Sequence, residues 1–185
     1  MQNAFEKNFF DLFGINRSFS IDRSLLRDRF RTMQKKFHPD NYATAGEQDR
    51  RISAQYAALI NEAFTTLSDP MQRGRYMLMQ LGINTDEEHD TRMDPEFLMQ
   101  QIEWREQLEA AQSSADSSME ILGGLSLLVN DEFAKREARI GEILDNLDKP
   151  GNIDSSLETA RHLVRELQFL GKMKSEIENA EETLF

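Results

Sequence analysis

The sequence predicts an all-α protein: a helical hairpin with a short flanking helix in the first half, and a three-helix bundle in the second. Apolar residues recur at helical spacing through most of the 185 residues. The chain has only four prolines, which leaves room for long helices. Two of these prolines follow an aspartate, as Asp69-Pro70 and Asp94-Pro95, and this pair is typical of a helix start.

The first elements are a short helix and a hairpin of two longer helices. A cluster at 9–13 ends at Gly14, which indicates a brief helix with a glycine stop. Asp22 is the predicted N-cap of the next helix, and Pro39 ends that helix. Each hairpin helix has an apolar stripe, made of Leu26, Phe30, Met33 and Phe37 in the first and of Ile52, Tyr56, Leu59, Ile60, Ala63, Phe64 and Leu67 in the second. The loop 38–48 would stand at the hairpin tip.

The first hairpin helix also has a basic side. Arg23, Arg27, Arg31 and Lys35 stand four residues apart, so their charges stack along one face. Like charges at this spacing cost a few tenths of a kcal/mol per pair. The face is therefore a candidate for binding an acidic partner, and a solvated helix surface is the alternative.

The tripeptide His38-Pro39-Asp40 follows this basic helix and must lie in a loop. A histidine beside an aspartate suggests acid–base catalysis. Catalysis would need a reacting group held nearby, and the loop has neither a nucleophile nor a glycine turn that could form an oxyanion site. We therefore predict no catalytic residues and no enzyme activity. A plain helix-stop turn is the other interpretation of these residues.

The short helix, the basic helix, the His-Pro-Asp loop and the segment from Ile60 to Pro70 together resemble a J-domain, the part of J-type co-chaperones that engages a DnaK-type ATPase chaperone. The resemblance implies that His38, Pro39 and Asp40 form a rigid recognition corner. Asp40 would accept a charge-assisted hydrogen bond from a chaperone arginine. It also implies that Arg27, Arg31 and Lys35 steer docking onto an acidic chaperone surface.

The second half predicts a bundle. A fourth helix ends at Gly82 and leads to a polar, acidic linker over 83–93. Three apolar-striped segments follow, at 93–112, 118–147 and 153–185, with Pro150-Gly151 between the last two. The predicted domains are thus 1–82 and 94–185.

One helix of the bundle has apolar residues on two sides. At about 100° per residue, Phe97, Trp104, Leu108 and Ala111 fall together as a buried stripe. The others, Leu98, Met99 and Ile102, lie about 140° away among the carboxylates of Glu103, Glu106 and Glu109. Phe169 in the last helix likewise projects away from its stripe. These residues predict an outward binding patch, unless neighbouring helices bury both sides.

The pieces FFDLFGI, KKFHPDN, ALINEAFTTLSDP, RYMLMQLG and PEFLMQQIEWREQLE resemble the HscB family of J-type co-chaperones in iron–sulfur cluster biogenesis, over nearly the whole chain. The resemblance implies two partners, the chaperone HscA and the cluster scaffold protein IscU. Scaffold-binding positions of the family match Leu98, Met99, Ile102, Glu103, Glu106 and Phe169. The sequence departs from the family at Ala110, where an acidic contact is common, at Gly74, and at Gly123-Gly124.

Composition excludes several function classes. The chain has no cysteine and three histidines, so we expect no disulfide, no metal site and no cofactor. It lacks the zinc-binding extension of mitochondrial relatives, which implies a bacterial type. Residues 86–185 hold 10 Lys and Arg against 24 Asp and Glu, which argues against nucleic acid as a partner. The apolar runs are too short for a membrane helix, so we expect a cytoplasmic protein.

Two alternatives to a scaffold-delivering co-chaperone stay open at this point. One is a general J-domain protein whose bundle binds unfolded clients through a broad Met-rich groove. The other is an assembly or nucleic-acid adaptor that uses the basic helix. The oligomeric state is also open, because exposed apolar patches permit a monomer or weak self-association.

Overall fold

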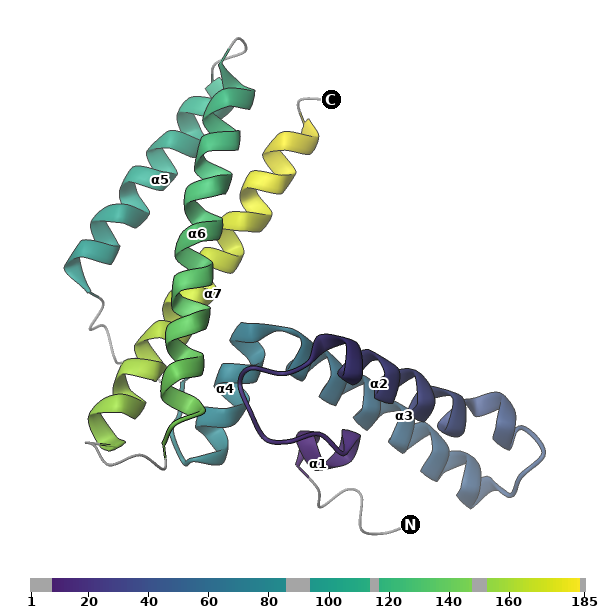
Figure 1. Ribbon diagram of the computed structural model, residues 1–185. Coiled ribbons are helices and arrows are strands. Elements are labelled where there is room, and N and C mark those ends of the chain that lie inside the picture. The colour runs from purple at the N-terminus through teal and green to yellow at the C-terminus, as the bar shows by residue number, and fades with distance from the viewer. Residues whose placement is uncertain (1–7, 86–93, 114–116, 148–152, 184–185) are drawn as a thin grey trace. The chain divides into compact units, whose positions relative to one another are not determined.

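The computed structural model describes residues 8–85, 94–113, 117–147 and 153–183, and every regular element in these ranges is helical (Figure 1). The elements are α1 (Phe9–Phe13), α2 (Arg23–Phe37), the 3-10 helix η2 (Pro39–Tyr42), α3 (Glu47–Ser68), α4 (Pro70–Gln80), α5 (Pro95–Ser113), α6 (Ser118–Leu144) and α7 (Ile153–Thr183). The all-α prediction is confirmed.

The ends of the first helices follow the expected local chemistry. Gly14 has φ 62°, a left-handed conformation that ends α1. Asp22 Oδ1 accepts hydrogen bonds from the backbone N–H of Ser24 at 2.8 Å and of Leu25 at 3.0 Å, so it is the N-cap of α2. At the other end of α2, His38 has ψ 133°, because Pro39 disfavours helical geometry in the residue before it.

The hairpin of α2 and α3 packs through aromatic rings. Phe30 stacks on Phe64 with 3.9 Å between ring centroids, and Phe37 stacks on Tyr56 at 4.5 Å. The two helices lie side by side in Figure 1 and are joined at the tip by η2. Helix α1 contacts both and buries Phe10 and Phe13, as the sequence predicts. The loop that follows α2 is thereby held at the end of a rigid pair of helices.

Residue contacts divide the chain into one unit that ends at Met77 and a second that starts at Leu78, so the division falls within α4. The first part of α4 belongs to the hairpin unit. There the Tyr76 hydroxyl accepts a hydrogen bond from the Phe9 backbone N–H at 2.8 Å, and the two rings stack. Most of the predicted linker, residues 86–93, lies outside the described residues. The functional boundary at residue 82 stays a prediction.

In the second unit, α6 packs against both α5 and α7 (Figure 1). Most residues of the predicted stripes are buried, and the buried ones include Phe97, Trp104, Leu108 and Ala111 of α5, Leu122, Leu125, Val129, Ile140 and Leu144 of α6, and Leu157, Val164, Leu167, Leu170, Met173 and Ile177 of α7. The predicted stripe residues Phe133, Ile143, Leu147, Leu163 and Ala180 are only partly buried. Gly123 and Gly124 lie inside an unbroken α6. The predicted three-helix bundle is confirmed for the described residues.

A charged cluster joins α6 to α7 near the edge of this core. Arg136 Nε donates to Glu166 Oε2 at 2.5 Å, and its Nη1 donates to Glu132. The Arg136 guanidinium also lies over the Phe97 ring at 4.6 Å from the centroid. Because Arg136 and Glu166 are largely buried, each needs the other as a partner. This arrangement fixes α5, α6 and α7 to one another.

Candidate functional site

The His-Pro-Asp loop is exposed but locally ordered. The side chains of His38 and Asp40 are 57% and 88% exposed. His38 Nδ1 accepts a hydrogen bond from the Asp40 backbone N–H at 3.3 Å and lies 3.5 Å from Asp40 Oδ2. Pro39 occupies the first turn of η2, where a missing N–H has no cost. The loop thus presents two polar side chains to solvent in one conformation.

Two further side chains bond to the last turn of α2 beside this loop, and the sequence analysis assigned neither a role. Asn41 Nδ2 donates to the Lys35 carbonyl at 2.6 Å, and Ser53 Oγ donates to the Phe37 carbonyl at 3.0 Å. Both carbonyls belong to the last turn of α2, where no helical N–H is available to them. An asparagine just after a helix-ending proline was the available signal for the first bond. Nothing in the sequence indicated that Ser53, on another helix, would supply the second.

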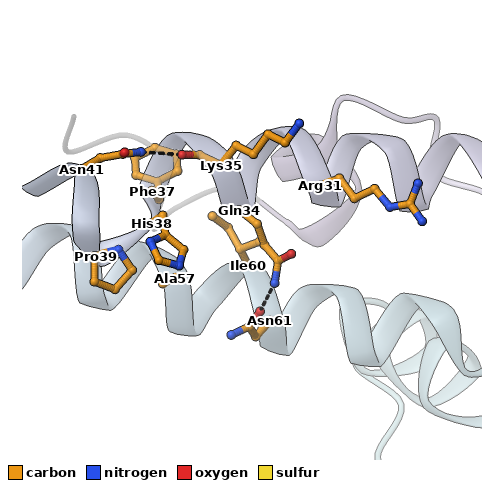
Figure 2. A pocket seen from close by; sticks show the side chains of 10 residues that line it. All are labelled: Arg31, Gln34, Lys35, Phe37, His38, Pro39, Asn41, Ala57, Ile60 and Asn61. Carbon is orange, nitrogen blue, oxygen red and sulfur yellow. Dashed lines mark hydrogen bonds between the residues drawn. The ribbon is translucent and has the colours of Figure 1, made fainter.

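Beside the loop, a groove of about 780 Å³ runs between α2 and α3. Figure 2 shows Pro39 and His38 near Ala57 at one end, with Ile60 and Asn61 of α3 beneath Gln34 of α2. Its apolar floor and open shape suit a partner's surface side chains better than a small ligand that must be enclosed.

The basic residues border the same groove. Arg31 and Lys35 line it together with His38 and Pro39, and Figure 2 shows both cationic chains extending from α2. Arg27 lies one turn further along the exposed side of α2, with its Nε donating to the Arg23 carbonyl at 3.2 Å. The structure therefore brings the loop and the basic face together on one surface. Asp40 is not among the residues that line the groove, and its 88% exposed carboxylate is open to a partner's donor.

The α5 patch, which we define as Leu98, Met99, Ile102, Glu103 and Glu106, lies wholly on the exposed side of the helix. The three apolar side chains are 47%, 63% and 52% exposed. The buried alternative for this side of α5, in which neighbouring helices cover both faces, is contradicted. An exposed apolar strip bordered by carboxylates matches the kind of surface that a protein partner covers.

The prediction that Phe169 projects outward needs correction. Its side chain is half-buried, stacked on Trp104 at 6.4 Å and edge-on to Phe97 at 5.8 Å. The helical wheel compared Phe169 only with the stripe of its own helix, and α5 covers part of the face that the wheel left open. The ring still lies near the α5 patch, because it packs against Phe97, the chain neighbour of Leu98, and Arg105 lies over it at 5.9 Å.

Other site chemistries find no support within the residues that the structure describes. These residues contain no group of three or more His, Cys, Asp or Glu placed to hold a metal ion. None of the helices in the described ranges has the length and apolar character needed to cross a membrane. Ala110, at the C-terminal side of the α5 patch, is exposed and supplies no charge.

Comparison with known proteins identifies the family. The family model described as the HSCB C-terminal oligomerisation domain matches residues 93–178. A co-chaperone protein HscB homolog from Vibrio vulnificus is 41% identical over 178 residues, which cover 96% of this chain and 99% of the relative. The solved structure of chaperone HscB from Vibrio cholerae matches with a TM-score of 0.82 and 38% identity, over 97% of this chain and 100% of that one.

A more distant relative shares the fold. The crystal structure of human co-chaperone protein HscB matches with a TM-score of 0.81 at 23% identity, over 95% of this chain and 82% of that one. With the His-Pro-Asp loop at the tip of a basic hairpin, these matches define a J-type co-chaperone, a class of proteins that are not enzymes. The chain belongs to the HscB family, which acts in iron–sulfur cluster biogenesis.

Proposed function

We propose that this protein binds an iron–sulfur cluster scaffold protein of the IscU type and delivers it to a specialised DnaK-type chaperone of the HscA type. The observation that carries the proposal is the presence of two exposed recognition surfaces on different units: the loop with its basic border, and the α5 patch. Each surface has the chemistry of one partner.

The proposed binding of the chaperone is supported by the positive charge of the groove's border. Arg27, Arg31 and Lys35 would raise the rate of encounter with an acidic surface, and this contribution would fall as salt rises. Once docked, Asp40 would accept a charge-assisted hydrogen bond from an arginine of the chaperone. His38 and Pro39 would contact the chaperone beside the groove. Because the loop is already ordered, docking would cost little conformational entropy. The contact would favour ATP hydrolysis, which takes place in the chaperone.

The proposed binding of the scaffold is supported by the apolar surface that it would bury. Covering Leu98, Met99 and Ile102 would remove exposed apolar surface from water, while Glu103 and Glu106 would select a basic rim on the scaffold. These exposed apolar residues include a single methionine, unlike the Met-rich groove expected of a general client binder. Phe169 would contribute the exposed edge of its ring and hold Trp104 and Phe97 in place beneath the patch.

Because both binding sites are on one chain, the protein would bring the bound scaffold to the chaperone. A scaffold bound to the second unit is tethered to a chaperone bound to the first, at an effective concentration on the millimolar scale for a short connection. The chaperone would therefore hydrolyse ATP while its substrate is within reach. We place this activity in the bacterial cytoplasm, in line with the bacterial relatives.

Self-association is part of the same proposal. The description of the family model over residues 93–178 names oligomerisation, which supports a monomer in equilibrium with a weak assembly for this chain.

Separate damage to the two surfaces tests the proposal. With His38→Gln, stimulation of the chaperone ATPase should be lost while scaffold binding is retained. With Leu98→Ala plus Phe169→Ala, scaffold binding should be lost while stimulation without scaffold is retained. Equal loss of both activities in both folded variants would contradict the two-site division.

A further inference from the structure

A second apolar strip, outside both recognition surfaces, lies on α6. Leu127 and Leu128 are 75% and 51% exposed. At about 100° per residue they belong to a stripe about 100° wide whose centre is opposite the buried side of α6. We call the part of this stripe from Glu120 to Lys135 the outer stripe, and it consists of Glu120, Gly124, Leu127, Leu128, Asp131 and Lys135, all of them exposed. Ala138 and Glu142 continue the exposed face toward the C-terminus of α6. Neither the bundle core nor the α5 patch uses any of these residues.

The outer stripe is complementary to itself. Its successive spacings are four, three, one, three and four residues, so the stripe reads the same in both directions along the helix. In an antiparallel pair of α6 helices with a two-fold axis between Leu127 and Leu128, each member of the stripe faces another member. Leu127 meets Leu128, Gly124 meets Asp131, and Glu120 meets Lys135. A two-fold interface needs this property, because each contact must occur twice.

From this geometry we propose that the outer stripe of α6 is the surface through which two copies of this chain associate, antiparallel about the two-fold axis. The proposal rests on the self-association stated above and names its surface. Four leucines would meet at the centre. Beside them Gly124 has no heavy atom within 4 Å of the place where a Cβ would be, so it leaves room for the Asp131 side chain of the second copy.

The charged ends of the stripe fit the same register. At 1.5 Å per residue, Glu120 and Lys135 lie about 11 Å from the two-fold axis on either side, near enough for long side chains to meet at a crossing angle of about 20°. The Lys135 ammonium contacts Asp131 and Glu132 of its own chain, each at 2.8 Å. An ammonium has three donors, so one is left for Glu120 of the second copy.

Charge also explains why this side of the bundle suits a second copy. The whole chain carries a net charge of −11, so two copies repel each other on average. The outer stripe holds one lysine and two carboxylates, and it is nearly neutral. A single helix pair covers less area than the roughly 1,200 Å² of a standard stable interface, so the dimer should be weak and should depend on protein concentration.

Sedimentation equilibrium of the full chain across a dilution series tests the surface. The wild type should dimerise reversibly. Leu127→Ser plus Leu128→Ser should remain monomeric, with an unchanged melting temperature because both side chains are exposed. Leu98→Ala, Met99→Ala and Ile102→Ala combined should dimerise like the wild type. A wild type that stays monomeric at every concentration overturns the self-association. A dimer that survives the leucine changes, or that the α5 changes abolish, overturns the assignment to α6.

Charge reversal tests the register. Glu120→Lys and Lys135→Glu should each weaken the dimer several-fold, and the double variant should recover it, because the pair is rebuilt with opposite sign. Lys135→Glu also breaks contacts within its own chain, so recovery in the double variant is the decisive result. Failure to recover overturns the antiparallel arrangement. These outcomes are independent of the proposed delivery, since stimulation of the chaperone ATPase should be the same for the Leu127, Leu128 variant and the wild type.

Discussion

The imidazole Nδ1 of His38 accepts a hydrogen bond from the backbone N–H of Asp40, with 3.3 Å between the two nitrogens. His38 therefore caps the first turn of η2 although its side chain is mostly exposed. Under the proposed function, the same side chain would both order the loop and contact the chaperone.

His38→Gln should reduce stimulation of the chaperone ATPase to the basal rate. Glutamine keeps a polar group but lacks the flat ring that lies beside Pro39 at the groove. Scaffold affinity should be unchanged, because the α5 patch belongs to the other unit. His162→Gln on α7 is the matched control and should keep both activities. ATPase assays and a binding titration measure the two effects, and a variant with undiminished stimulation would remove the loop from the mechanism.

Asn41→Ala should loosen the loop. The change removes the 2.6 Å bond to the Lys35 carbonyl and should cost about 1 kcal/mol in the free energy of unfolding. Ser53→Ala removes the 3.0 Å bond to the Phe37 carbonyl and should cost a similar amount. Only the Asn41 variant should lower ATPase stimulation several-fold, because Asn41 is part of η2 itself. Denaturant titration measures the stability of each variant, and ATPase rates measure the effect on the loop. Equal losses of stimulation in the Asn41 and Ser53 variants would count against a specific role for η2.

Arg31→Glu combined with Lys35→Glu should slow association with the chaperone about tenfold or more at low salt, and the difference from the wild type should shrink as salt is raised. Both side chains border the groove beside the loop. Arg50→Glu with Arg51→Glu on α3 makes the same change in net charge away from that border, since neither residue lines the groove. Stopped-flow binding measures the rates. If the α3 control slowed association as much, total charge would be the cause and the basic border would have no special role.

Leu98→Ala with Met99→Ala should weaken scaffold binding about 10- to 100-fold without changing the melting temperature, because both side chains are exposed. Phe169→Ala should weaken binding and also cost about 2 kcal/mol of stability, because its ring packs on Trp104 and Phe97. Ile153→Ala, another exposed apolar residue, is the control for the α5 changes. Calorimetric titration and thermal unfolding measure both quantities. Normal scaffold affinity in the Leu98, Met99 variant would move the binding site elsewhere.

Acid should weaken the bundle through Glu132. Its hydrogen bond from Lys135, and then that from Arg136, lower the pKa of the Glu132 carboxyl below its ordinary value of 4.5, despite the opposing effect of burial. A lowered folded-state pKa means that the stabilisation is complete above about 4.5 and is lost as the pH falls through the folded value. Glu132→Gln should therefore unfold more easily than the wild type at neutral pH and approach it in acid. A stability gap that stayed constant with pH would contradict this origin.

Helix positions and the core could be predicted from the sequence because both depend on local chemistry. Asp22 caps α2, Pro39 ends it, and the apolar spacing of each helix marks its buried side. The α5 patch was predictable for the same reason, since a wheel separates Leu98 from Trp104 without reference to any other helix.

What the sequence could not show depends on contacts between helices. The wheel leaves Phe169 exposed, but α5 crosses that face and the ring meets Trp104. The bond from Ser53 to Phe37 joins residues on different helices. Leu127 and Leu128 gave no signal either, because a helix in a bundle can bury a second face, and only the packed structure shows that α6 leaves this one open.

The most direct test of the account is single-turnover ATP hydrolysis by the chaperone, with this protein and the scaffold added separately and together. If one molecule delivers the scaffold, both together should accelerate hydrolysis beyond the product of their separate effects. A mixture of the His38→Gln and Leu98→Ala, Met99→Ala proteins, both also carrying the Leu127, Leu128 changes so that they cannot pair, should not restore that acceleration. Full restoration by the unlinked mixture would show that the two surfaces need not share a chain, and would contradict delivery by tethering.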